Sequence, residues 1–173
     1  MKSLLDLFEE ISCKKKRRWI NSSYEKLPSS IKNLMNSYKL EIYLITNKEM
    51  DALTNDKGVL GLYLNKEKQQ IYLNAHQSKS DLTNSFYHEL GHFIDKCIGD
   101  KLNKNDINSK TDEILLSCFN LEKANFEYLY YSKDISEFFA QSMAELLKGN
   151  NPFLFLIPNT SNYTLELLKK VIS

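Results

Sequence analysis

The sequence predicts an α+β fold. Apolar residues recur with the period of an amphipathic helix near both ends of the chain, and three β-forming runs lie between them. Strands early in the chain and most helices late in it are typical of an α+β layout. The length of 173 residues suits one domain with a sizeable core. We expect a single domain over residues 1–173, with N-terminal helices over about 1–38, a sheet over about 40–76, a helix over about 80–98 and a C-terminal helical part over about 109–173.

The N-terminal part predicts two helices. Residues 2–12 have a helical period, and a second helix is expected to begin near Ser29 and Ser30, after Pro28. Between them, the basic run of residues 14–18 is interpreted as a solvated face or a helix end. The formal net charge of the chain is +1, so its composition gives no indication of nucleic-acid binding.

Three strands are predicted in the middle of the chain. Residues 40–45 are rich in β-forming side chains, and residues 59–64 and 70–75 each show an alternating pattern. The polar segment 65–69 joins the last two runs and has the length of a hairpin loop. We therefore expect a β-hairpin with one strand at the edge of the sheet.

The helical period returns near residue 80. Ser78 or Ser80 is the expected N-cap, and Asp81 suits the positive end of the helix dipole. Gly99 is the predicted terminator of this helix. Further helices are predicted over about 109–128, 135–148 and 161–172.

Composition and cysteine usage narrow the class of protein. The three cysteines have wide, unrelated spacings, which indicate neither a disulfide framework nor a thiolate metal site. Cys97 lies on an apolar stripe and is interpreted as a buried hydrophobic residue. No stretch approaches the ~20 uninterrupted apolar residues of a membrane span, and no secretory leader is visible. As written, the chain is expected to be a monomer in the cytoplasm of the producing cell.

Two of the three histidines lie in the stretch of residues 87–92, Tyr-His-Glu-Leu-Gly-His. On a helix, residues four apart lie on the same face, so His88 and His92 can turn a nitrogen to one ion. Zinc accepts imidazole ligands, and Glu89 beside them would hold the water that zinc makes more acidic. Two surface histidines are the alternative. The adjoining apolar stripe disfavours it, because buried histidines need polar partners or a metal.

A catalytic zinc needs a third protein ligand. His76 is a weak candidate, because its loop would have to fold back over the end of the helix. Glu137, Gln141 and Glu145 recur every fourth residue and give a second predicted helix its own polar face. Glu137 also fits a capping box with Asp134 as the N-cap, so the residue pattern alone leaves both roles open.

Two stretches together resemble the catalytic domain of the anthrax lethal factor family, which includes the Pro-Pro endopeptidases. They are YHELGHFID at residues 87–95 and SEFFAQSMAELL at residues 136–147. In that family a Glu followed by Phe-Phe-Ala is the third zinc ligand, and a tyrosine seven residues upstream faces the zinc. The resemblance covers roughly residues 40–172 and implies a zincin-like fold, with Zn²⁺ bound by His88, His92 and Glu137.

The resemblance implies further roles. It selects Tyr130 to face the zinc, whereas spacing alone also allows Tyr128 or Tyr131. Where the family has an acidic residue after Phe-Phe-Ala, this chain has Gln141. The departure affects a hydrogen bond that supports the ligands, and it leaves the ligand set unchanged. Asp95, one turn after the second histidine, would accept the second N–H of a ligating histidine, and an exposed Asp near a helix end is the alternative.

These patterns predict a zinc-dependent endopeptidase. Glu89 would act as general base, and Tyr130 would stabilise the oxyanion. The substrate would be a peptide or protein bound extended along an edge strand. A catalytically silent zincin-like binding module is the alternative, which the intact Glu89 disfavours. The family resemblance also implies secreted or toxin-like action, and the proline preference of the Pro-Pro endopeptidases is not carried over.

Overall fold

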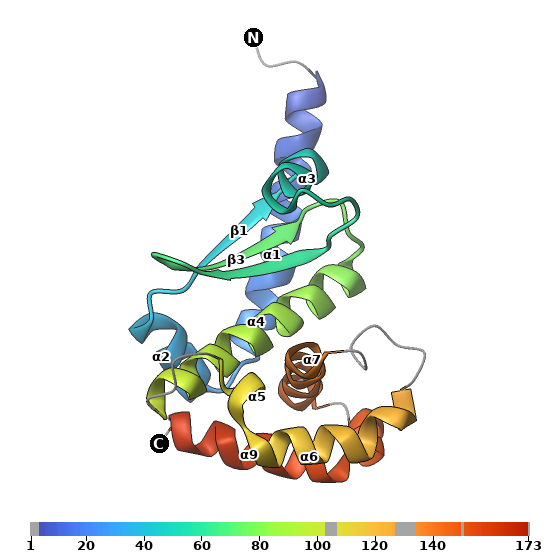
Figure 1. Ribbon diagram of the computed structural model, residues 1–173. Helices are drawn as coiled ribbons and strands as arrows, with labels where there is room; N and C mark the ends of the chain where they lie inside the picture. Colours follow the sequence, from blue (N-terminus) through green and yellow to red (C-terminus); the bar gives the residue numbers. More distant parts are fainter. Residues whose placement is uncertain (1–3, 103–106, 127–133, 150, 173) are drawn as a thin grey trace. The chain divides into compact units, whose positions relative to one another are not determined.

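The structure, a computed structural model, describes residues 4–102, 107–126, 134–149 and 151–172. It has an α+β architecture, in which helices and one three-stranded sheet follow one another along the chain (Figure 1). The α+β class predicted from the sequence is confirmed. Two compact units are distinguished, residues 1–86 and 87–173, and the division falls within helix α4 (Lys79–Lys101). The expectation of a single domain stays a prediction.

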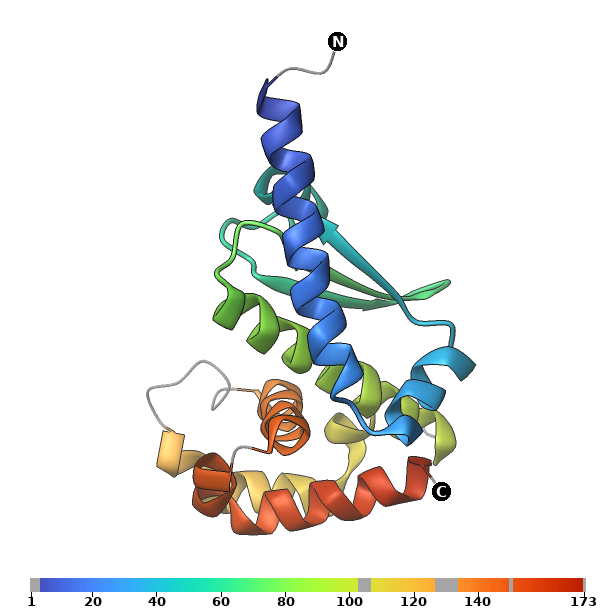
Figure 2. The ribbon, with the colours of Figure 1, turned by 180° about the vertical axis from the view of Figure 1, so that it is seen from behind.

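The N-terminal unit begins with helices α1 (Leu4–Glu25) and α2 (Ser29–Ser37). The expected helix over residues 2–12 was therefore too short. Lysine and arginine are good helix formers, so the basic run 14–18 continues α1, and Ile20 beyond it is buried. The helix crosses one face of the sheet, as the front and back views agree (Figure 2).

The sheet consists of β1 (Glu41–Ile45), β2 (Gly61–Asn65) and β3 (Gln69–Asn74), in the order β1-β3-β2. β2 and β3 are antiparallel and form the predicted hairpin, whereas β1 runs parallel to β3. Ile71 and Leu73 of the central strand are fully buried. The expectation that one hairpin strand lies at a sheet edge is confirmed for β2.

Helix α3 (Asn47–Thr54) was not predicted. It starts with a capping box, in which the Glu49 N–H donates to the Thr46 hydroxyl at 3.3 Å and the Thr46 N–H donates to the Glu49 carboxylate at 2.7 Å. Met50 of α3 is fully buried. This helix lies between β1 and the hairpin, and a crossover of this kind lets β3 pair in parallel with β1.

Helix α4 begins directly after Ser78, whose hydroxyl accepts a hydrogen bond from the Asp81 N–H at 3.2 Å. Of the two expected caps, Ser78 is therefore the one used. The helix continues past Gly99, and the Leu102 N–H still donates to the Ile98 carbonyl at 3.0 Å. The prediction that Gly99 ends the helix was wrong, because a glycine is tolerated inside a helix whose flanking residues are buried, as Ile98 is.

The C-terminal unit contains two helices and a 3₁₀ turn in place of the single helix expected over residues 109–128. They are α5 (Asn108–Thr111), α6 (Glu113–Glu122) and η1 (Lys123–Phe126). The break occurs at Asp112, whose backbone is extended and whose carboxylate accepts the Leu115 N–H at 3.0 Å. An Asp in this position is a good N-cap, so a new helix starts there.

The rest of this unit comprises α7 (Ile135–Lys148), α8 (Asn151–Leu156) and α9 (Pro158–Ile172). α7 has the predicted bounds and packs against α5, α6, α8 and α9. α8 was not predicted, and α9 starts earlier than expected, because proline is well suited to the first position of a helix. Among the residues that the structure describes, no helix is both long and apolar enough to cross a membrane.

Candidate metal centre

The candidate centre lies within the C-terminal unit, where α4 and α7 approach each other. His88 and His92 lie one turn apart on α4, and their ring centroids are 4.9 Å apart with an interplanar angle of 87°. The two side chains are 19% and 16% exposed. Both rings are therefore largely enclosed by neighbouring atoms and keep a small solvent-exposed area.

Gly91 is the reason that α7 can lie this close to α4. A Cβ atom placed on Gly91 would lie 2.8 Å from the Cα atom and 2.9 Å from the carbonyl carbon of Ala140 on α7. Real Cβ atoms do not approach backbone atoms to such distances. The glycine between the two histidines therefore sets the spacing at which side chains of α7 meet those of α4.

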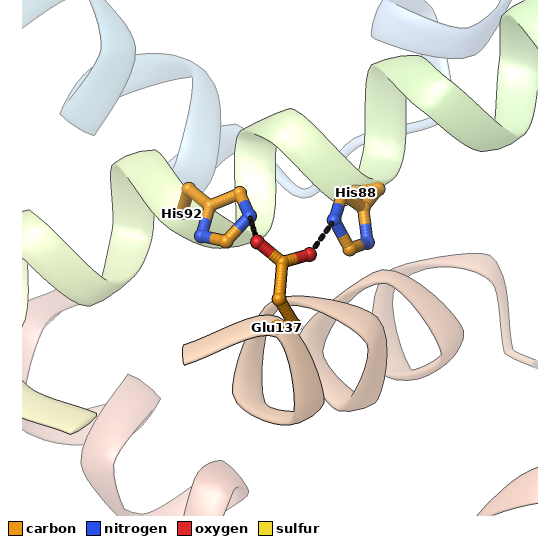
Figure 3. Close-up of side chains that lie close together, drawn as sticks. All are labelled: His88, His92 and Glu137. Atoms are coloured by element: carbon orange, nitrogen blue, oxygen red, sulfur yellow. Dashed lines mark hydrogen bonds and ion pairs between the residues drawn. The ribbon is translucent and has the colours of Figure 1, made fainter. Parts of the chain in front are cut away.

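Glu137 reaches both histidines from the first turn of α7. Its Oε2 lies 3.0 Å from His88 Nε2, and its Oε1 lies 3.4 Å from His92 Nε2 (Figure 3). Asp134 is the N-cap of α7, and its carboxylate accepts the N–H groups of Ser136 and Glu137. The backbone of Glu137 thus belongs to the cap, while its carboxylate faces the two imidazoles instead of completing a capping box.

Hydrogen bonds and charges within this group shift the pKa values of Glu137 and His92. Burial alone would raise the pKa of the Glu137 carboxyl, but the hydrogen bonds and charges of His88 and His92 outweigh burial and lower the pKa to about 2. Burial would lower the pKa of His92, whereas the hydrogen bond to Glu137 and the charge of Glu89 raise it. The carboxylate of Glu137 is therefore ionised at neutral pH and available as a ligand.

A chain of polar contacts runs from His88 along α7. His88 Nδ1 lies 3.2 Å from Gln141 Oε1, and Gln141 Nε2 donates to Glu145 Oε1 at 2.6 Å. Lys148 Nζ donates to the same oxygen of Glu145 at 2.6 Å. Glu137, Gln141 and Glu145 are the residues that recur every fourth position, so one face of α7 carries the entire chain of contacts.

The structure places two further predicted residues on α4. Glu89 is 7% exposed and follows His88 directly. Asp95 is fully buried, so the alternative of an exposed Asp near a helix end was wrong. Its carboxylate accepts the Ser109 N–H at 2.8 Å and also the Ser109 hydroxyl. A bond from Asp95 to a ligating histidine stays a prediction.

The donor set suits a zinc ion. Among the described residues, His88, His92 and Glu137 form the group whose ligand atoms, one from each residue, all lie within 4.8 Å of one another. Ligand atoms at 2.0–2.1 Å from a tetrahedral zinc are themselves about 3.3 Å apart. Small side-chain rotations would therefore close the group around one ion. Two imidazoles and one carboxylate also match the ligand types of catalytic zinc sites.

The other residues that the sequence suggested for the site are His76 and a group of tyrosines. His76 is exposed and is not a member of this group. Tyr130 and its alternatives Tyr128 and Tyr131 lie outside the described residues. Sequence reasoning assigned no role to Gly91, although an isolated glycine inside a helical pattern often marks a close packing contact.

Comparison with known proteins gives no further identification: no family model matches the chain, and no curated protein matches it.

Proposed function

We propose that the chain is a zinc-dependent endopeptidase with a zincin-like fold, related to the anthrax lethal factor family that its two motifs resemble. The single observation that carries the proposal is the meeting of His88, His92 and Glu137, with Glu89 in the same helical turn. Neither motif alone supplies three ligands and a general base. The first supplies two imidazoles and a carboxylate for proton transfer, and the second supplies the third ligand, a carboxylate from a different helix.

His88, His92 and Glu137 would hold the ion, and a bound zinc supplies Lewis-acid chemistry that lowers the pKa of water toward ~7. Glu89 would accept a proton from the water molecule that attacks the scissile carbonyl carbon. As the bond between the carbonyl carbon and the amide nitrogen breaks, Glu89 would deliver that proton to the leaving amine nitrogen. Burial of Glu89 supports this role, since a carboxylate screened from solvent transfers a proton to a defined partner rather than to bulk water.

The resemblance assigns the oxyanion donor to Tyr130, which lies outside the described residues. A neutral phenol donates a hydrogen bond to the carbonyl oxygen as negative charge develops there. Tyr130→Phe should therefore keep the zinc affinity and lower kcat by about 10²-fold or more. Tyr128→Phe and Tyr131→Phe are the matched controls, and loss of kcat in one of them instead would reassign the donor.

The substrate proposed for this activity is an extended peptide segment that adds a strand to the sheet. β2 has an edge position and is antiparallel to its neighbour, which leaves one side of its backbone for a peptide. Main-chain hydrogen bonds would give affinity, and side-chain pockets would give sequence preference.

Cleavage of a peptide library tests the proposal. Wild-type protein loaded with zinc should cleave a subset of peptides, a chelator should abolish the cleavage, and added zinc should restore it. Glu89→Gln should retain zinc and lose about 10²–10⁴-fold in rate, because an amide cannot accept the proton of water. If the protein binds zinc but cleaves no peptide in the library, the silent binding module would replace the endopeptidase as the proposed function. Equal cleavage by Glu89→Gln would show that another group is the base.

A further inference from the structure

A groove in the N-terminal unit lies between α1 and β1, the second edge strand of the sheet. Among the residues that the structure describes, β1 pairs with β3 on one side and with no strand on the other. The groove has a volume of about 430 Å³, and pockets that bind ligands have volumes of roughly 300–1,000 Å³. Its lining includes Ile42, Tyr43 and Leu44 of β1 and Arg17, Asn21 and Tyr24 of α1.

The groove runs along the edge of β1 and not only over one face of the sheet. Successive side chains of a strand point to opposite faces, so a cavity that touches three residues in a row also meets the backbone between them. The Ile45 carbonyl accepts the N–H of Ala75, directly after β3, at 2.7 Å, so Ile45 directs its backbone groups toward β3. Alternate residues of a strand face opposite sides, so Ile42 and Leu44 turn their N–H and C=O groups away from β3.

The groove also leaves apolar side chains partly uncovered. Ile42 and Leu44 of β1 lie opposite Ile71 and Leu73 of β3, so these four side chains share one face of the sheet. The β3 pair is fully buried, whereas the β1 pair is only half-buried. An extended chain in the groove would cover the β1 pair and would continue the sheet. In this mode of binding, main-chain hydrogen bonds give affinity and side-chain contacts give selectivity.

The charge of the groove indicates which kind of segment it accepts. Arg17 brings a guanidinium group to the groove and belongs to the basic run 14–18. Glu41, the acid of β1, already contacts the Lys68 ammonium group at 3.3 Å and accepts from the Gln70 amide at 3.0 Å. A guanidinium binds a carboxylate through two parallel hydrogen bonds, so the groove is complementary to an acidic side chain.

We propose that the groove between α1 and β1 binds an extended segment of another protein, which pairs with the edge of β1 and places an acidic side chain against Arg17. The site is separate from the candidate metal centre, because the residues that line it belong to the N-terminal unit and the three metal ligands belong to the C-terminal unit. It is also separate from β2, the edge proposed for the peptide that is cut.

Binding of dye-labelled, end-blocked peptides to the full-length protein tests the proposal. One peptide alternates valine and threonine, which favour the extended conformation, around a central glutamate. The comparison peptide carries lysine in place of the glutamate. Fluorescence anisotropy should show saturable binding of the glutamate peptide and about 5–10-fold weaker binding of the lysine peptide. Mass spectrometry after each titration verifies that the peptides are intact.

Two pairs of variants locate the binding. Arg17→Glu should reverse the preference, so that the lysine peptide binds more tightly than the glutamate peptide. Arg18→Glu makes the same change of charge at the next residue of α1, outside the lining of the groove, and should keep the preference of the wild type. Asn21→Trp should fill the groove and abolish binding of both peptides, whereas Ser22→Trp should bind like the wild type. All four positions are exposed, so each variant should fold.

Peptides that are N-methylated at alternate residues test the pairing with β1. An extended peptide turns alternate N–H groups to opposite sides, so one of the two methylated isomers should lose binding and the other should keep it. Equal binding of the two isomers, equal losses in Arg17→Glu and Arg18→Glu, or no saturable binding by the wild type would each overturn the proposal. Self-association of the wild type that Asn21→Trp removes would also contradict it, because a second copy of the chain would then occupy the groove.

Discussion

Two buried carboxylates of the C-terminal unit have similar chemistry and different partners. Glu122, at the end of α6, accepts the N–H groups of Asn159 and Thr160 at 2.7 Å and 2.9 Å, and so closes the first turn of α9. Glu137, at the start of α7, divides its two oxygens between the Nε2 atoms of His88 and His92. Each carboxylate uses both oxygens, and each joins two segments that are distant in sequence.

The partner determines what each carboxylate can do. The lone pair of a backbone amide nitrogen is delocalised into the carbonyl group, and the N–H keeps its hydrogen at neutral pH, so Glu122 stabilises the helix that it caps. The Nε2 atom of an imidazole can lose its hydrogen and bind a metal through a lone pair. The same Glu side chain is therefore part of the fold at position 122 and part of a candidate metal centre at position 137.

The largest effect is expected for Glu137→Ala. The variant reduces a three-ligand site to two imidazoles, so its zinc affinity should fall by more than the ~100-fold that loss of a supporting partner costs. Competition with a chelating dye measures this. Glu122→Ala is the control and should bind zinc like the wild type. Equal zinc affinity in the two variants would remove the distinction between the two carboxylates.

Gly91→Ala tests whether the contact between α4 and α7 positions Glu137. The added methyl group would clash with the carbonyl oxygen of Ala140 and would lie 2.8 Å from its Cα atom, so α7 must shift. We expect zinc affinity to fall by about 10–100-fold and stability to fall by about 1–3 kcal/mol. Gly149→Ala, at the C-cap of the same helix with φ of 69°, should cost about 1 kcal/mol in stability and leave zinc affinity unchanged. Unaltered zinc affinity in Gly91→Ala would show that the close contact is irrelevant to the centre.

Glu122→Ala should lower stability without touching the metal. Its removal leaves the N–H groups of Asn159 and Thr160 without this acceptor at the start of α9, where Thr160 is buried. The expected loss is about 1–3 kcal/mol in the free energy of unfolding, measured by urea denaturation of the metal-free protein. A loss of less than ~0.5 kcal/mol would mean that water or another group replaces the carboxylate.

The smallest effect is expected for Tyr163→Phe. The Tyr163 hydroxyl donates to Asp112 at 3.0 Å, and burial followed by this hydrogen bond raises the pKa of the phenol to about 12. Loss of the hydroxyl should cost about 0.5–1.5 kcal/mol at neutral pH. A raised pKa means that the neutral form is the one stabilised. The difference between wild type and variant should therefore be constant below pH ~10 and should shrink as pH rises toward 12. A difference that grows over this range would contradict the assignment.

Local patterns predicted much of the fold. The bounds of α7 follow from its helical period and from Asp134 at its N-cap. An Asp in this position caps a helix because its carboxylate accepts the first free N–H groups. The hairpin follows in the same way from two alternating runs and a short polar loop. α3 was missed although Thr46 and Glu49 carry a capping-box pattern, because its short apolar stripe lies between two strands.

The candidate centre was predictable where it depends on one helix and unpredictable where it depends on two. The i, i+4 spacing of His88 and His92 fixes their common face, whatever the rest of the chain does. Glu137 had two readings from its own neighbourhood, and only the packing of α7 on α4 directs its carboxylate to the histidines. The role of Gly91 depends on its contact with Ala140 of the partner helix, so sequence spacing could not give it.

The X-ray absorption spectrum of zinc bound to the wild-type protein tests the central claim most directly. Ligation by His88, His92 and Glu137 predicts nitrogen and oxygen neighbours at about 2.0–2.2 Å, with outer-shell scattering from two imidazoles. The spectrum of Glu137→Ala should keep both imidazoles if it retains any zinc. A sulfur neighbour at about 2.3 Å, or scattering from three imidazoles in the wild type, would contradict this ligand set. It would place the metal on a cysteine or on His76 instead.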